Sequence, residues 1–286
     1  MLMKLFANLC CRGVACCAAL LCLAGSVSGQ TARTMDFPLI TSTPGDEAIL
    51  RIFFPEKVAP SGMAVVACPG GGYRNLSMEN EGYDWAPFFN ERGIVFAVLK
   101  YRMPRTDRRR PLADAKEALR VLHMYAEGWG VDPDRIGIMG FSAGGHLAAT
   151  TANRAPRKIR PAFQILFYPV ITMDRRFTHM GSHDNLLGKK ASRSLEDRYS
   201  NELLVTESTP QAFIVFSADD RTVNPLNGSS YHQALQEKGV PSEYHVYPSG
   251  GHGWGWYRKS FEWRDKVLQD LDGWLRKLEE SYAPAR

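Results

Sequence analysis

The motif Gly-Phe-Ser-Ala-Gly at residues 140–144 constrains the fold of this chain more than any other segment. It follows a short apolar run at residues 136–139 and precedes an alanine-rich stretch typical of a helix. A serine at a sharp turn from strand to helix adopts strained backbone geometry, and glycines two residues to either side leave room for the tight approach. Such a turn lifts the serine hydroxyl clear of the sheet. The pattern therefore predicts a reactive serine at Ser142.

Short apolar runs alternate along the chain with amphipathic stretches, which is typical of a mostly parallel sheet covered by helices on both faces. Strands are predicted at residues 49–54, 64–68, 95–100, 135–139, 163–167, 212–216 and 243–246. Helices are predicted at residues 86–92, 111–125, 143–152, 225–238 and 261–278. Residues 172–210 show no clear periodicity, and so long an irregular segment usually shapes a binding site. No repeat or linker divides the chain, so we expect one domain.

The first 29 residues are predicted to be a secretory signal peptide. Lys4 and Arg12 precede a short apolar run at residues 14–25. The small residues at 27–29 are typical of a signal-peptide cleavage site. That run is too short for a stable membrane span, and no other segment approaches spanning length. We therefore expect residues 30–286 to form the mature domain, in the periplasm or outside the cell.

Cysteine content and charge exclude several classes of protein. Five of the six cysteines precede residue 30, so the mature chain keeps only Cys68 and can form no internal disulfide. Cys68 is expected to be a small buried residue at the end of a strand rather than a catalytic thiol. The net charge is only +5, and the basic run at residues 105–110 is typical of a solvated loop. Without a recognition motif or a sustained basic face, nucleic-acid binding is disfavoured.

A serine hydroxyl becomes a good nucleophile only beside a base that takes its proton and a third group that orients the base. Asp219 and Asp220 follow one of the predicted strands, and the spacing of Asp220 from the next valine favours it as the orienting acid. Asp219 is expected to cap or brace the loop. His252 follows the last predicted strand, among glycines on a loop where it has no core to fill. We therefore predict that Ser142, Asp220 and His252 act together.

The other histidines near the motifs are weaker candidates for a catalytic or metal-binding role. His146 follows Ser142 in the predicted helix and is expected to pack or to hydrogen-bond. His179 and His183 have the i, i+4 spacing of a metal-binding pair, but Gly181 lies between them and no HExxH glutamate is present. A place in a substrate-contacting loop is favoured over a metal site.

The segment Pro-Gly-Gly-Gly-Tyr at residues 69–73 follows the strand at 64–68. Bare glycine backbone at this place can face a substrate carbonyl and donate hydrogen bonds to a developing oxyanion. The predicted donors are the N–H groups of Ala143 and Gly71, with Gly72 as a third. No lysine or serine follows in P-loop spacing, which disfavours phosphate binding.

With these residues placed, the chain resembles the α/β-hydrolases. Within them it is similar to the small bacterial carbohydrate esterases often called acetyl xylan esterase-like, which are related to feruloyl-esterase-type domains. The matching stretches run in family order over nearly all of the mature chain: residues 69–73, 81–82, 99–104, 140–147, 168–171, 181–188, 199–202, 218–220 and 247–254. One departure is Val-Asn-Pro at residues 223–225, where relatives usually have Val-Pro.

The resemblance implies a single-domain α/β-hydrolase fold with Ser142 as nucleophile, Asp220 as acid and His252 as general base. It also implies that the loop around Asn185 lies near the site. The expected function is a serine carboxylesterase that removes O-acetyl groups from plant cell-wall polysaccharide, with an acylated carbohydrate as substrate and no metal or organic cofactor.

Aromatic residues beside these motifs suggest where a sugar would bind, because sugars stack on aromatic rings. Tyr73 and Trp254 are the predicted substrate-binding rings, together with Asn185. Trp256 is a further candidate, for which burial in the core is an equal alternative.

Three alternatives stay open at this point. The substrate could be another acylated glycan or a feruloyl ester. A prolyl-oligopeptidase-type serine peptidase shares the fold and triad, but such proteins normally carry a large extra N-terminal domain, and the first predicted strand here begins soon after Gln30. A catalytically dead, hydrolase-like binding protein is disfavoured because the serine, acid, histidine and glycine loop are all intact.

Overall fold

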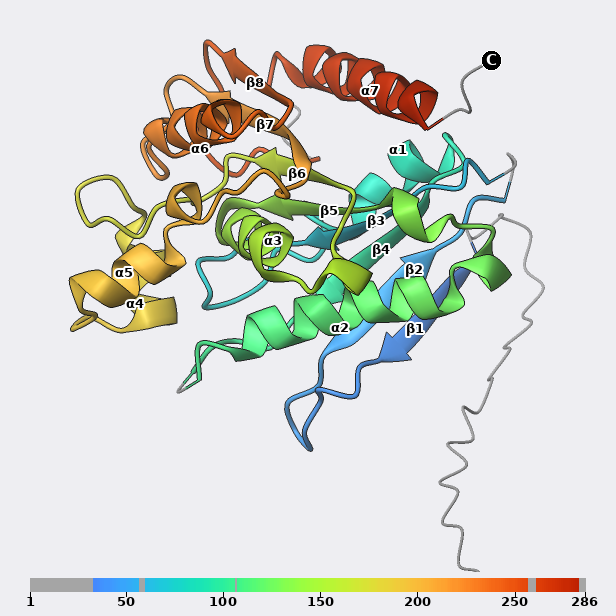
Figure 1. The fold of residues 1–286 in the computed structure, drawn as a ribbon, viewed down its shortest axis with the longest axis horizontal. Coiled ribbons are helices and arrows are strands. Elements are labelled where there is room, and N and C mark those ends of the chain that lie inside the picture. Colours follow the sequence, from blue (N-terminus) through green and yellow to red (C-terminus); the bar gives the residue numbers. More distant parts are fainter. Residues whose placement is uncertain (1–32, 57–59, 106, 257–260, 283–286) are drawn as a thin grey trace, which may run out of the picture. The chain divides into compact units, whose positions relative to one another are not determined.

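The computed structural model describes residues 33–56, 60–105, 107–256 and 261–282. The predicted signal peptide lies outside these residues. Residues Ala32–Arg286 form one compact unit. Its centre is an eight-stranded sheet with the strand order β1-β2-β4-β3-β5-β6-β7-β8 (Figure 1). The strands are β1 (Thr34–Pro38), β2 (Ile49–Phe53), β3 (Ala64–Cys68), β4 (Val95–Lys100), β5 (Ile136–Phe141), β6 (Phe163–Phe167), β7 (Gln211–Ser217) and β8 (Ser242–Tyr247).

The sheet is parallel from β4 to β8, and β1 and β2 join its edge antiparallel to their neighbours. Every residue of β3, β5 and β6 is buried. Such continuous apolar strands are expected when helices cover both faces of a parallel sheet. The mostly parallel sheet predicted from the alternating pattern is confirmed.

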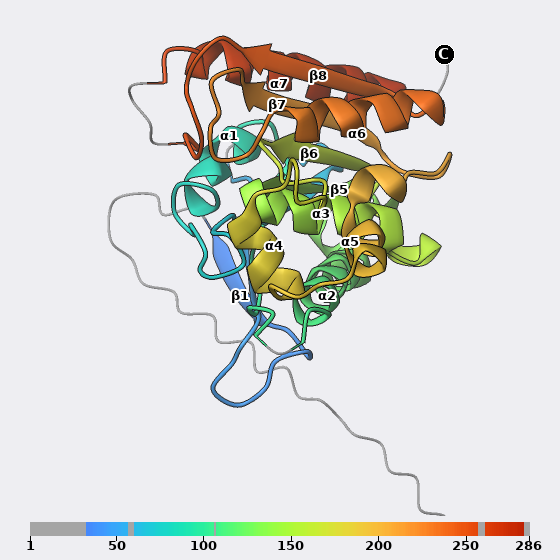
Figure 2. The ribbon, with the colours of Figure 1, turned by 90° about the vertical axis from the view of Figure 1, so that its left-hand side faces the viewer.

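Helices cover the sheet on both faces (Figures 1 and 2). One face carries α2 (Arg110–Tyr125), α3 (Ser142–Arg154) and α6 (Leu226–Glu237), and the other carries α1 (Ala86–Asn90) and α7 (Arg264–Ser281). Two short helices, α4 (Met180–Leu187) and α5 (Arg193–Tyr199), lie beyond α3 at one end of the sheet. Single 3₁₀ turns occur at Tyr83–Trp85, Glu127–Trp129, Pro133–Arg135, Arg157–Ile159 and Asn201–Leu203.

Two expectations need correction. The segment 172–210 is not irregular throughout, since it contains α4 and α5. These helices have only 8 and 7 residues, too few to show a helical period in the sequence. The edge strand β1 was not predicted, because it is short, ends in a proline and is alternately exposed.

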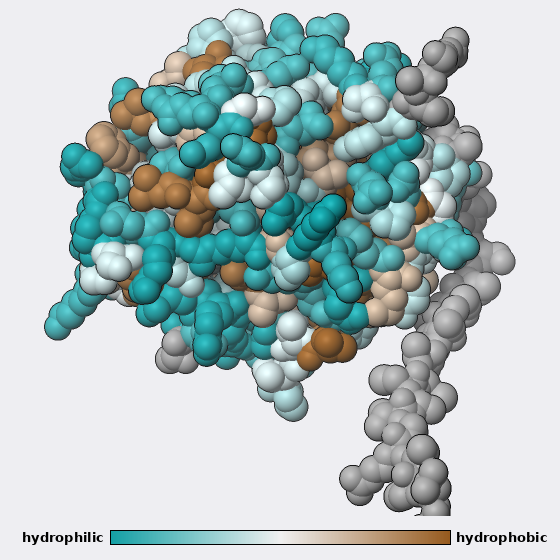
Figure 3. Space-filling view, in the orientation of Figure 1, coloured by the Kyte–Doolittle hydropathy of each residue, from teal (hydrophilic) through white to brown (hydrophobic). Residues whose placement is uncertain are grey.

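The surface in Figure 3 is mostly hydrophilic, with apolar residues in small, scattered groups. Within the described ranges, no helix combines the length and the apolar composition that a membrane crossing requires.

Candidate active site

Ser142 occupies the sharp turn between β5 and α3. Its φ angle is +51°, a left-handed conformation that residues other than glycine rarely adopt. A Cβ on Gly140 would collide with the carbonyl oxygen of Gly144, and one on Gly144 would collide with the carbonyl oxygen of Cys68. The turn therefore requires glycine on both sides of the strained serine.

His252 lies between Ser142 and Asp220. Its Nε2 is 2.9 Å from the Ser142 Oγ, and its Nδ1 is 2.7 Å from an Asp220 carboxylate oxygen. The other Asp220 oxygen accepts the backbone N–H groups of Thr222 and Val223, each at 2.9 Å. A carboxylate with these partners accepts a hydrogen bond from Nδ1–H and so keeps the ring proton on Nδ1, which leaves Nε2 as the acceptor for the serine hydroxyl. The arrangement can carry a proton away from Ser142.

Asp219 has a different partner from Asp220. Its Oδ1 accepts the backbone N–H of Gly251 at 2.8 Å, next to His252 in the sequence. Asp219 therefore braces the loop that carries the histidine, which is the role expected for it.

The glycine loop after β3 lies beside Ser142. A Cβ on Gly70 would be 2.8 Å from the Phe141 carbonyl oxygen and 3.0 Å from the Ser142 Cβ. Gly71 and Gly72 have φ angles of +133° and +64°. At Gly71 a side chain would also collide with the backbone of Asn75. This close approach explains why the loop is built of glycine.

Ala143, the other predicted donor, is the second residue of α3. The first N–H groups of a helix have no acceptor within the helix and carry the positive end of its dipole. The backbone on both sides of Ser142 can therefore supply donors to an anion.

Tyr73 and Asn185 hold the glycine loop in place. The exposed Asn185 donates from Nδ2 to the carbonyl oxygen of Gly72 at 2.8 Å. The Tyr73 hydroxyl donates to Nδ1 of His146 at 2.8 Å, and Nε2 of His146 donates to the Tyr199 carbonyl oxygen at 2.7 Å. Burial lowers the pKa of His146 to about 4. His146 thus hydrogen-bonds as a neutral ring, consistent with the expectation from sequence.

The prediction that Tyr73 and Trp254 stack on a sugar is wrong, because both rings are buried, with exposed fractions of 3% and 1%. Trp254 stacks on Phe261 at 4.2 Å between ring centroids and donates its indole N–H to Ser217. Trp256 is only partly buried and packs against the core. Position next to a motif did not reveal which way these rings point.

Glu81 and Tyr168 support the site, and no physical signal in the sequence identified them. The carboxylate of Glu81 accepts the N–H of Gly70 at 3.0 Å and the hydroxyl of Tyr168 at 2.8 Å. The Tyr168 ring packs against that of His252, with 4.8 Å between centroids, and its hydroxyl accepts the N–H of Gly255. Burial raises the pKa of Glu81. The pair connects the glycine loop to the histidine loop.

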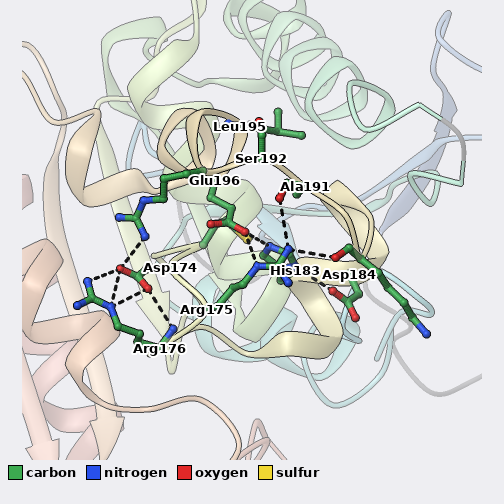
Figure 4. A network of polar contacts seen from close by, with 12 residues as sticks. Asp174, Arg175, Arg176, His183, Asp184, Ala191, Ser192, Leu195 and Glu196 are labelled. Atoms are coloured by element: carbon green, nitrogen blue, oxygen red, sulfur yellow. Dashed lines mark hydrogen bonds and ion pairs between the residues drawn. The ribbon is translucent and has the colours of Figure 1, made fainter.

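His179 and His183 have different partners. The buried His183 contacts Asp184 at 2.9 Å and Glu196 at 3.1 Å (Figure 4). Nδ1 of His179 accepts the N–H of Ser182 at 3.3 Å and caps α4. Across the described ranges, no group of three or more histidine, cysteine, aspartate or glutamate side chains is arranged to hold a metal ion.

Comparison with known proteins finds an acetylxylan esterase and an endo-1,4-β-xylanase that are similar to this chain. The chain is 41% identical over 263 residues to an acetylxylan esterase of Xylanibacter ruminicola, across 91% of this chain and 54% of the relative. It is 33% identical over 204 residues to the endo-1,4-β-xylanase B of Butyrivibrio fibrisolvens, across 66% of this chain and 32% of the relative. The chain therefore spans about half the length of the first relative and a third of the second.

A solved structure is also similar. The acetyl ester-xyloside bifunctional hydrolase from Caldicellulosiruptor lactoaceticus matches with a TM-score of 0.78 at 28% identity, covering 88% of this chain and 98% of that chain. The sequence pattern of the alpha/beta hydrolase fold family matches residues 65–256. Fold, site geometry and relatives agree with the resemblance seen in the sequence, and the chain belongs to the α/β-hydrolase family.

Proposed function

We propose that this protein is a serine esterase that removes O-acetyl groups from xylan or a related plant cell-wall polysaccharide through an acyl-enzyme. The observation that carries the proposal is the position of His252, within hydrogen-bond distance of both Ser142 and Asp220. The acetylxylan esterase relative supports the substrate class. The chemistry needs no metal or organic cofactor.

In the first half of the reaction, the Ser142 Oγ attacks the ester carbonyl while Nε2 of His252 takes its proton. Asp220 holds the imidazole in the right tautomer and stabilises the positive charge that forms on it. The N–H groups of Ala143 and Gly71, with Gly72 as a third, bind the oxyanion. One such donor contributes roughly 10²–10³ in turnover.

The carbon–oxygen bond to the sugar then breaks and the sugar oxygen takes the proton from His252, which completes the first half. The acetyl group stays on Ser142. In the second half, a water molecule gives a proton to His252 and attacks the acetyl carbonyl. The bond between the acetyl carbon and the Ser142 Oγ then breaks, and Oγ takes the proton back from His252. Acetic acid leaves and ionises to acetate in water, so the enzyme is regenerated.

The test is acetate release from acetylated xylan by residues 30–286. Ser142→Ala should reduce the rate by at least about 10³-fold, because the nucleophile is gone. Ser229→Ala, on α6, is the matched control and should leave the rate unchanged. Undiminished activity in Ser142→Ala would refute the mechanism. Hydrolysis of aryl acetates without release from xylan would retain the mechanism and point to another acylated glycan or a feruloyl ester.

We also propose that residues 1–29 are a signal peptide and that the mature enzyme is secreted or periplasmic. The basic residues, short apolar run and small residues before Gln30 support this. N-terminal sequencing of the exported protein should begin at Gln30. A mature protein that keeps Met1 would contradict the proposal.

A further inference from the structure

His179 borders the glycine loop at the active site. A Cβ on Gly72 would lie 3.8 Å from the His179 Cε1, so the ring is next to the backbone that carries the proposed oxyanion donors. Burial and the neighbouring His252 lower the pKa of His179, while Asp220 opposes the effect. The imidazole is therefore neutral and lies within electrostatic reach of two residues of the proposed triad.

The hydrogen bonds of His179 determine its tautomer. The backbone N–H of Ser182 donates to Nδ1 at 3.3 Å, and the Ser182 hydroxyl lies 2.8 Å from the same atom. Since Nδ1 accepts, the single proton of the neutral ring is on Nε2. The described residues provide no hydrogen-bond acceptor for this Nε2–H, and the ring is only partly buried. The site thus contains a donor that none of the described residues uses.

Contacts on two sides hold α4, and therefore its N-cap residue His179, in position. Glu196 of α5 accepts from Nε2 of His183 at 3.1 Å and from Nε of Arg175 at 2.6 Å. On the other side, Asn185 ties α4 to the carbonyl oxygen of Gly72. A donor fixed by such contacts is suited to recognition, because little conformational entropy is lost when it binds.

We propose that His179 recognises the sugar side of the ester, with its Nε2–H donating to a hydroxyl oxygen next to the acetylated carbon. The proposal rests on the esterase function above. A sugar leaving group offers neighbouring hydroxyl oxygens, whereas a phenol leaving group offers none. Exposed apolar surface of Phe177 and Met180 adjoins His179 in the chain and suits the apolar face of a sugar ring. His179 is thus a residue that favours acetylated sugars over simple aryl acetates.

The variant His179→Asn separates the two tasks of the side chain. Asparagine is a favoured N-cap, so its Oδ1 can accept the Ser182 N–H, but its shorter side chain has no donor at the place of Nε2. We expect kcat/KM for an acetylated xylo-oligosaccharide to fall about 3- to 10-fold, the equivalent of one neutral hydrogen bond. For phenyl acetate, which carries the same acyl group, kcat/KM should stay within about twofold.

His179→Ala is the second variant, because it removes both the donor and the cap. It should show the same selective loss on the sugar ester together with a lower melting temperature. Wild-type selectivity in His179→Asn, or an equal loss on both substrates, would overturn the proposal. These outcomes are distinct from failure of the esterase mechanism, which would show as undiminished phenyl acetate hydrolysis in Ser142→Ala.

Discussion

Two neighbouring aspartates show how local contacts give the same residue type different tasks. Asp220 is buried, with one oxygen on His252 and the other on two backbone N–H groups. Asp219 is exposed, and its side chain accepts the N–H of Gly251. The spacing in the sequence favoured Asp220, and the geometry gives the reason: its carboxylate is the one that reaches the imidazole.

Asparagine variants of these two residues should therefore differ greatly in activity. Asp220→Asn cannot hold the productive tautomer of His252, and kcat should fall by up to about 10⁴-fold, as for other triads of this kind. Asp219→Asn keeps a side-chain oxygen that can accept the Gly251 N–H, and its activity should stay within about tenfold of the wild type. Steady-state hydrolysis of phenyl acetate measures both. Equal losses in the two variants would contradict the assignment.

Glu81 accepts two buried hydrogen bonds that a glutamine cannot accept together. In Glu81→Gln, either the Gly70 N–H or the Tyr168 hydroxyl faces an amide N–H, so the unfolding free energy should fall by about 1–3 kcal/mol. Activity should fall as well, because the pair holds the glycine loop and packs on His252. Urea unfolding and kcat are the measurements. Glu79→Gln, on the exposed surface nearby, is the control and should change neither.

At the scale of elements, much of the sheet could be predicted because its strands are continuous apolar runs. The triad candidates could be predicted too, since each follows the carboxyl end of a strand: Ser142 after β5, Asp220 after β7 and His252 after β8. The helix α4 could not, because its start depends on a histidine cap. The Tyr73 and Trp254 rings could not be oriented either, since tertiary packing decides which aromatic side chain reaches the surface.

His146 joins three elements, and its titration should affect stability. It lies on α3 and contacts Tyr73 of the glycine loop and Tyr199 at the end of α5. Burial lowers its pKa in the folded protein to about 4, from an ordinary value of 6.5. Below pH 6.5 the unfolded state therefore binds more protons than the folded state. Stability is lost as pH falls from 6.5 towards 4, by about 2 kcal/mol between pH 7 and pH 5.

Comparison with His146→Gln isolates this contribution. The amide can replace the hydrogen bond to Tyr199 but does not titrate. Between pH 7 and pH 5, the unfolding free energy of the variant should change by about 2 kcal/mol less than that of the wild type. Denaturant unfolding at the two pH values measures the difference. An identical pH dependence of the unfolding free energy in the two proteins would show that the pKa of His146 does not differ between the folded and unfolded states, which would contradict the prediction.

On the scale of the whole molecule, one sheet both stabilises the protein and assembles the site. The candidate residues run from Gly71 to His252 in the sequence and meet because parallel strands end at the same edge of the sheet. Stability comes from the same strands, which are buried from end to end in β3, β5 and β6. The mature chain proposed here has no disulfide to add to that core.

The reactivity of Cys68 can be used to test whether stability depends on the buried strands alone. It ends β3, is fully buried, and is the free cysteine of the described residues. Burial raises the pKa of its thiol, and only a thiolate reacts readily. In residues 30–286 a thiol reagent should therefore label nothing while the protein is folded and one thiol after denaturation, and a reductant should not change the melting temperature. Fast labelling of the folded protein would show that β3 opens locally.

The rate of slow labelling measures how often Cys68 becomes accessible. Because β3 has paired strands on both sides, Cys68 should become accessible only when the central sheet opens. The opening free energy calculated from the labelling rate should then equal the free energy of global unfolding.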